Sequence, residues 1–128
     1  MSSDLYQEQI LDHYRHPRNY GSLEHPDATF ADSNPLCGDM VAVDLIYEGD
    51  QVAEVRFRGS GCAISQASTS MLTEMVEGRT KEEARAIPRE ALLEELGVPL
   101  SPARVKCALL GYKVMMGALY GLPPRLEE

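Results

Sequence analysis

The stretch MVAVDLIYEGDQVAEVRFR, residues 40–58, is the part of the sequence that predicts the fold. Apolar and polar residues alternate over 40–47 and again over 53–58, which is the period of a β-strand with one buried face. Residues 48–50, Glu-Gly-Asp, separate the two runs and are typical of a tight turn. The sequence therefore predicts an antiparallel hairpin with one apolar face and one face in water. The expected apolar face carries Val41, Val43, Leu45, Tyr47, Ala53, Val55 and Phe57.

Helical patterns lie on both sides of this hairpin. A stripe of apolar residues after Asp4, which can cap a helix, ends before Pro17. After the hairpin we expect helices over 63–77, from Thr80 to near Pro88, over 89–96 and from Ser101 to about Tyr120, and a short strand over 29–31. The expected core faces are Ile64, Ala67, Met71 and Met75 on the first of these helices, and Val105, Leu109, Tyr112, Met116 and Leu119 on the last.

The order of helix, strands and helices predicts an α+β fold, in which helices cover one face of a small antiparallel sheet. The chain has 128 residues, and domains hold roughly 150, so we expect one domain over residues 1–128. A chain of this length buries about two-thirds of its unfolded surface and forms a core without disulfides.

Charge and hydropathy exclude several classes of protein. The formal net charge is −8, which disfavours nucleic acid and negatively charged membrane surfaces as partners. The chain contains no run of about 18 apolar residues and no basic start followed by an apolar segment. The expected compartment is therefore the cytoplasm, where Cys37, Cys62 and Cys107 would be thiols.

Each cysteine lies at the boundary of an expected element. Cys37 precedes the first strand of the hairpin and Cys62 follows the second, so antiparallel pairing places both at one end of the sheet. Cys107 joins them only if the last helix docks its N-terminal part there. The alternative is that the cysteines are small buried hydrophobes, although Gly38 and Gly61 beside two of them would let backbone N–H groups approach a thiolate.

Asp39 completes a candidate set of four metal ligands. It lies two residues after Cys37, and side chains two apart on an extended segment share a face. Three thiolates and one carboxylate suit Zn²⁺ or an iron–sulfur cluster. The long gaps between Asp39, Cys62 and Cys107 are not those of a zinc finger.

Three segments make the chain resemble a known family. They are Asn34-Pro35-Leu36-Cys37-Gly38-Asp39, the stretch Gly59-Ser60-Gly61-Cys62-Ala63-Ile64-Ser65-Gln66-Ala67-Ser68, and Val105-Lys106-Cys107. Together with Leu11-Asp12-His13-Tyr14 and Pro17-Arg18-Asn19, they resemble the U-type iron–sulfur cluster assembly proteins, which comprise IscU, SufU and the N-terminal domain of NifU. The resemblance spans about residues 6–120.

The resemblance implies an α+β sandwich with its ligands at one exposed end. It implies that Cys37, Asp39, Cys62 and Cys107 bind a [2Fe–2S] cluster transiently, or Zn²⁺ in its absence. It also implies that a cysteine desulfurase supplies the sulfur as a persulfide and that apo iron–sulfur proteins receive the cluster. The persulfide acceptor corresponds to Cys107 in the scaffold branch and to Cys37 in the SufU branch.

The sequence departs from both branches, so two functions remain open: a non-enzymatic cluster scaffold, or a zinc-dependent sulfurtransferase that activates the desulfurase. Lys106 stands where IscU proteins have histidine, while the long insertion that SufU proteins carry before the third cysteine is missing. Lys106 is expected either to pair with Asp39 or sulfide, or to be solvated. Residues 100–104 do not match the Leu-Pro-Pro-Val-Lys motif read by a dedicated Hsp70 chaperone, so that partner is not expected. A third alternative is a structural zinc domain.

Two further features carry open alternatives. By resemblance, Tyr6 acts in homodimerisation or in docking the desulfurase, and the alternative is a mobile terminus. His13 and His16 form a His-x-x-His pair at the end of a helix, for which packing or solvent exposure is favoured over metal binding.

Overall fold

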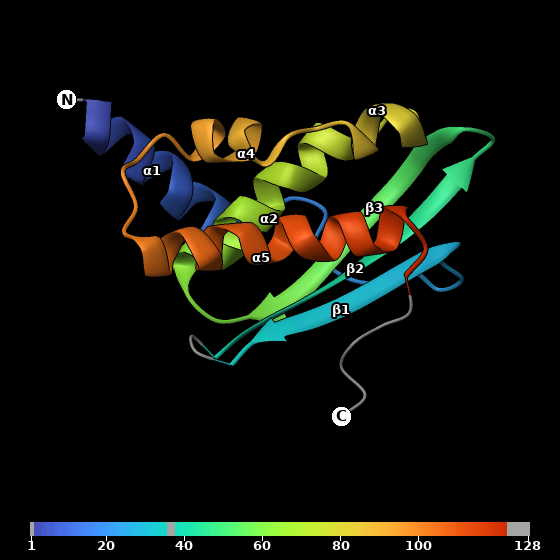
Figure 1. Ribbon diagram of the computed structural model, residues 1–128, viewed down its shortest axis with the longest axis horizontal. Coiled ribbons are helices and arrows are strands. Elements are labelled where there is room, and N and C mark those ends of the chain that lie inside the picture. The colour runs from blue at the N-terminus through green and yellow to red at the C-terminus, as the bar shows by residue number, and fades with distance from the viewer. Residues whose placement is uncertain (1, 36–37, 123–128) are drawn as a thin grey trace.

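The computed structural model describes residues 2–35 and 38–122 and has the expected α+β architecture. The elements in chain order are α1 (Ser2–Arg15), β1 (Ala28–Asn34), β2 (Asp39–Glu48), β3 (Gln51–Ser60), α2 (Ala63–Val76), α3 (Lys81–Arg85), α4 (Arg89–Leu96) and α5 (Pro102–Leu119). The strands form an antiparallel sheet in the order β1-β2-β3, and the helices lie on one side of it (Figure 1). Within the described residues, no helix is long and apolar enough to span a membrane.

The hairpin of β2 and β3 is confirmed, with one correction to its pattern. Ile46 pairs with Glu54, but the register shifts between Ile46 and Tyr47, so that Tyr47 pairs with Val52. This β-bulge leaves Ala53 as the extra residue and turns the side chain of Val52 inward. The core therefore contains Val52, whereas strict alternation predicts that Ala53 faces the core.

Asp44 departs from the expected solvent-facing side of the hairpin. Its side chain is on the outer face of β2, yet the residue is only 3% exposed. The backbone N–H of Leu23 donates to Oδ2 at 3.0 Å and the hydroxyl of Thr29 donates to Oδ1 at 2.8 Å. Arg58 forms an ion pair with Oδ2 at 3.0 Å. The chain before β1 is thereby tied to the outer face, which strand periodicity alone does not reveal.

Helix α2 is buried on nearly every side, although the sequence predicts one apolar face. It contacts α1, α5 and β3 at once, so its hydroxyl side chains are enclosed as well. Most of these hydroxyls donate to backbone carbonyls, as Ser68 does to the oxygen of Ala108 at 2.9 Å and Thr69 to that of Ser65 at 2.8 Å, while Ser70 contacts the ring of His13. Because each hydroxyl has an acceptor, a polar helix can occupy the centre of the fold.

The predicted core face of α5 is wrong by about one residue. Of the five residues expected to face the core, Leu119 is buried, and Tyr112 and Met116 are partly buried against the core. The other buried residues of this helix are Cys107, Ala108, Leu110, Gly111, Val114, Met115, Gly117 and Ala118. A Cβ at Gly111 would collide with the Thr69 side chain of α2, so the two helices pack closely through small residues. Since α2 and the sheet both pack against α5, its buried surface includes Leu110 and Met115 as well as small residues and is wider than a single stripe.

The predicted helix ends are confirmed where capping residues are explicit. Thr80 forms a capping box with Glu83, Ser101 accepts the N–H of Arg104, and Gly97 ends α4 with a φ of 71°. Two boundaries differ: α1 begins at Ser2 rather than at an Asp4 cap, and β1 covers 28–34 rather than 29–31.

Candidate metal centre

Asp39 is the first residue of β2 and is only 1% exposed. Antiparallel pairing places the start of β2 beside the end of β3, with Met40 opposite Ser60. The carboxylate therefore reaches the turn that follows β3, where Oδ1 accepts the backbone N–H of Cys62 at 2.8 Å. Its other oxygen, Oδ2, lies 3.5 Å from the Sγ atom of Cys62.

Cys62 is the N-cap residue of α2 and is partly buried. Its side chain makes no capping hydrogen bond to the helix and instead faces the Asp39 carboxylate. The positive end of the α2 dipole favours negative charge at this Sγ atom, which suits a thiolate ligand. From the sequence, a backbone N–H beside Gly61 was expected to approach a thiolate. In the structure, the N–H of Cys62 donates to the Asp39 carboxylate instead.

Cys107 comes from α5 and is the member whose position the sequence left undecided. It is buried, at 4% exposure, on the face of α5 that packs against the core. One ligand atom each from Asp39, Cys62 and Cys107 lies within 4.8 Å of the others. Sulfur atoms around a tetrahedral zinc ion, with Zn–S bonds near 2.3 Å, are about 3.8 Å apart, so small adjustments bring these atoms into coordination range.

Cys37 lies outside the described residues. Near it, the described N–H of Gly38 donates to the carbonyl oxygen of Asn34 at 2.9 Å, which joins the end of β1 to the start of β2. The segment that contains Cys37 thus connects to the described chain directly beside Asp39. The structure brings together three of the four predicted ligands, and the fourth stays a prediction.

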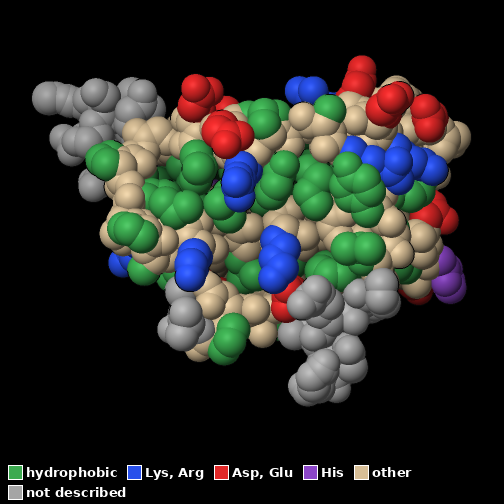
Figure 2. All heavy atoms as spheres, viewed as in Figure 1, with side chains coloured by type: hydrophobic (Ala, Val, Ile, Leu, Met, Phe, Trp, Pro, Cys, Tyr) green, Lys and Arg blue, Asp and Glu red, His purple; other side chains and the backbone are tan. Residues whose placement is uncertain are grey.

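Lys106 is exposed and lines a cavity of about 580 Å³ beside α5, together with Arg89, Leu109 and residues 33–35. Among the described residues, no ion pair joins it to Asp39, and its pairing with sulfide stays a prediction. Figure 2 shows this face of the molecule, on which lysine and arginine side chains are spread among hydrophobic ones.

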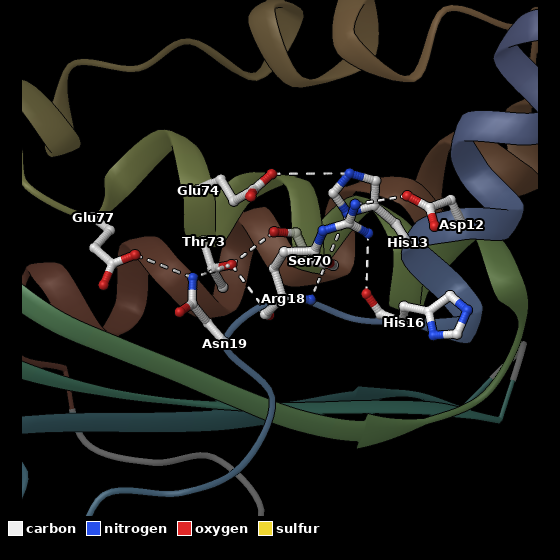
Figure 3. Close-up of polar contacts among 9 residues, drawn as sticks. All are labelled: Asp12, His13, His16, Arg18, Asn19, Ser70, Thr73, Glu74 and Glu77. Carbon is white, nitrogen blue, oxygen red and sulfur yellow. Dashed lines mark hydrogen bonds and ion pairs between the residues drawn. The ribbon is translucent and has the colours of Figure 1, made fainter.

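The two histidines of the His-x-x-His pair take separate roles (Figure 3). His13 is buried, and its Nδ1 atom lies 2.7 Å from the hydroxyl of Ser70, which also accepts the N–H of Arg18. Burial, and then the positive charge of Arg18, lower the pKa of His13 below its ordinary value. His16 is exposed and its ring points away from His13. The packing role is therefore the one that the structure supports for His13, which links α1 to α2.

Comparison with known proteins places this arrangement in a family. The family model described as "NifU-like N terminal domain" matches residues 5–127. The iron-sulfur cluster assembly scaffold protein IscU of Escherichia coli is 33% identical over 118 residues, which cover 89% of this chain and 91% of that protein. The zinc-dependent sulfurtransferase SufU of Bacillus subtilis is 36% identical over 132 aligned positions, which cover 87% of this chain and 86% of that protein.

A solved structure shares the fold. The putative iron-sulfur cluster assembly scaffold protein for the SUF system from Fervidobacterium islandicum superposes with a TM-score of 0.78 at 32% identity. The match covers 93% of this chain and 99% of that one. With a family match over nearly its whole length and relatives of this similarity, the chain belongs to the NifU-like N-terminal domain family, the U-type iron–sulfur cluster assembly scaffolds.

Proposed function

We propose that this protein is a scaffold on which iron and sulfur form a labile [2Fe–2S] cluster, which it then transfers to apo-proteins. The ligands would be Cys37, Asp39, Cys62 and Cys107. The observation that carries the proposal is the convergence of Asp39, Cys62 and Cys107, which come from β2, the start of α2 and α5, to within 4.8 Å of one another. Three donors from distant parts of the chain meet at one end of the sheet.

The donor set fits a cluster that is cargo rather than a permanent centre. Clusters held by four thiolates are usually resident redox groups. A carboxylate is a harder ligand than a thiolate and is less suited to the iron of a cluster, so Asp39 should weaken retention. The three cysteines would hold the cluster while it is assembled, and the carboxylate would make its release easier.

Sulfur would reach the site from a cysteine desulfurase. In that step, a scaffold thiolate attacks the outer sulfur of the desulfurase's cysteine persulfide, a new S–S bond forms, and the desulfurase cysteine leaves as a thiolate. Cys107 and Cys37 are the candidate acceptors. Since Cys107 is only 4% exposed, transfer to it requires its sulfur to become accessible, whereas Cys37 lies outside the described residues. Single Cys→Ser variants, labelled for persulfide after incubation with a desulfurase, identify the acceptor.

A zinc-dependent sulfurtransferase is the second candidate function. The 36% identity to the Bacillus protein of that name favours it, and three thiolates with one carboxylate also suit tetrahedral Zn²⁺. The 132 aligned positions exceed the 128 residues of this chain, so that relative has residues with no counterpart here. This difference agrees with the missing insertion, but it does not separate the two functions, because a relative named as a scaffold protein also aligns over 132 positions.

Metal analysis separates the two functions. The scaffold predicts that anaerobic reconstitution with iron, cysteine and a desulfurase yields visible [2Fe–2S] absorption and acid-labile sulfide, followed by transfer to an apo-ferredoxin. The sulfurtransferase predicts tight, stoichiometric zinc and strong stimulation of desulfurase turnover without a cluster. A structural zinc domain predicts unfolding when zinc is chelated. A protein that folds without metal and assembles no cluster contradicts the first proposal.

The remaining assignments belong to the same proposal. We place the protein in the cytoplasm as a single domain over residues 1–128, with a cysteine desulfurase and apo iron–sulfur proteins as partners and no role for nucleic acid. A homodimer through Tyr6 is one arrangement that the resemblance allows, and the side chain of Tyr6 lies outside those described. Size-exclusion chromatography of the wild type and Tyr6→Ala tests it.

A further inference from the structure

Gly61 lies between β3 and Cys62 and packs directly against Asp39. Its φ of +134° is in a region that residues with a side chain rarely adopt. A Cβ built at this position would lie closer than 3.0 Å to three atoms of Asp39, namely Oδ1, Cγ and Cα. The turn after β3 can therefore take its course only because residue 61 has no side chain.

This close approach determines how the Asp39 carboxylate is held. The next residue, Cys62, donates its backbone N–H to Oδ1 at 2.8 Å, which leaves Oδ2 facing the Cys62 sulfur at 3.5 Å. One oxygen thus has a backbone donor and the other is directed at the cluster of donor atoms. A carboxylate held in this way presents a single oxygen to a metal.

We propose that Gly61 is a positioning residue, which acts through Asp39 to set the carboxylate's place among the metal ligands. A side chain at residue 61 would push the carboxylate away from the amide of Cys62 and hence from the sulfur atoms of Cys62 and Cys107. The effect of this positioning on cluster release rests on the proposed function, whereas the contact between Gly61 and Asp39 is independent of that function.

The zinc affinity of four proteins tests this inference: the wild type, Gly61→Ala, Asp39→Ala and the double variant, each measured by competition with a chromophoric chelator. We expect each single variant to weaken zinc binding about tenfold, as is common when the orientation of a ligand is lost. The double variant should be no weaker than Asp39→Ala alone, because both changes remove the same ligand. Losses that multiply in the double variant would show that Gly61 acts independently of Asp39 and would overturn the inference.

Two other glycines provide matched controls. Gly78 has a φ of +88°, but a Cβ at this position would meet nothing within 4 Å, so Gly78→Ala measures backbone strain alone. Gly59→Ala would collide with the carbonyl oxygen of Met40 rather than with Asp39, so it measures crowding at the neighbouring end of β3. Zinc affinity should be unchanged in Gly78→Ala, and the effect of Gly59→Ala should persist in full when Asp39→Ala is added. An effect of Gly61→Ala no larger than that of Gly78→Ala would also contradict the inference.

The stability of the metal-free proteins gives an independent readout. Gly61→Ala should lower the unfolding temperature, and Asp39→Ala should reduce that loss towards the Gly78→Ala value, because the colliding Oδ1 and Cγ atoms are then gone. If Gly61→Ala fails to fold, recovery of folding in the double variant gives the same answer. Thermal losses that simply add would refute the coupling.

These measurements separate the two proposals. A wild type that forms no cluster ends the proposed scaffold function, while the stability cycle still tests Gly61 against Asp39. Conversely, a cluster that assembles and transfers, combined with no coupling in either cycle, ends the inference about Gly61 and leaves the scaffold in place.

Discussion

Two aspartates on the same strand are both almost inaccessible to solvent, and they have opposite surroundings. Asp44 accepts hydrogen bonds from Leu23 and Thr29 and is neutralised by the guanidinium of Arg58. Asp39 has the N–H of Cys62 and a neighbouring thiol, and among the described residues no Lys, Arg or His side chain lies within 4.0 Å of its carboxylate.

The difference shows why burial alone does not identify a metal ligand. A buried carboxylate is costly unless its charge is matched. At Asp44 the protein itself supplies the matching charge and donors, so the residue joins the outer segment to the sheet. At Asp39 the charge is left without a cation in the described chain, beside two sulfur atoms, which is the arrangement that a metal ion would complete.

The largest expected effect is at Asp44. Replacing it in Asp44→Ala leaves the partly buried N–H of Leu23 and the hydroxyl of Thr29 without their acceptor and Arg58 without its partner. We expect a loss of about 3 kcal/mol in the free energy of unfolding, measured by urea denaturation of the metal-free protein. Asp44→Asn, which keeps acceptor capacity, should lose less. Zinc affinity of the folded variants should not change, and a large change there would remove the contrast with Asp39.

Asp39 should show the reverse balance. Asp39→Ala removes one acceptor from the amide of Cys62, so the metal-free protein should lose only about 1 kcal/mol. The main effect at this position should be on the cargo: a reconstituted cluster should be retained longer in Asp39→Cys, where a fourth thiolate replaces the carboxylate. The half-time of transfer to an apo-ferredoxin measures this. Transfer at the rate of the wild type would contradict the role assigned to Asp39.

The smallest expected effect is the pH dependence of stability caused by His13, which is buried as the two aspartates are. Burial and the charge of Arg18 lower its pKa in the fold, although Glu74 and Asp12 oppose this. Since the folded protein binds a proton more weakly than the unfolded chain does, stability should be complete well above the unfolded pKa of about 6.5 and decline as the pH falls below it. Urea denaturation of the metal-free protein between about pH 7.5 and pH 5.5 measures the decline.

A matched variant identifies the residue responsible. His13→Gln should flatten this pH dependence, whereas His16→Gln should leave it unchanged, because His16 is exposed. A dependence that survives in His13→Gln would assign the proton uptake to another group.

Local patterns in the sequence predicted the elements and part of the site. The hairpin over 40–58 follows from alternation and a Gly-containing turn, and the caps at Thr80, Gly97 and Ser101 follow from hydrogen bonds that span only a few residues. Antiparallel pairing then places Asp39 beside Cys62 without further information.

The errors share a cause that lies outside any one element. The core face of α5 was misplaced because α2 and the sheet pack against this helix together, so that Leu110 and Met115 are buried as well as Gly111 at the contact with α2. Asp44 was expected in water because strand periodicity does not include the segment that folds over it. Ala53 was expected inside because alternation does not detect a bulge.

The amino-acid sequence by itself determined the α+β class, the hairpin and the pairing of Asp39 with Cys62, since these depend on backbone geometry and contacts between adjacent strands. Only the tertiary structure decided that Cys107 joins them, that Gly61 packs against the carboxylate, and that Asp44 is neutralised while Asp39 is not. These depend on how a helix from the end of the chain docks on a sheet from its middle, and such packing is set by the shapes and charges of distant segments together.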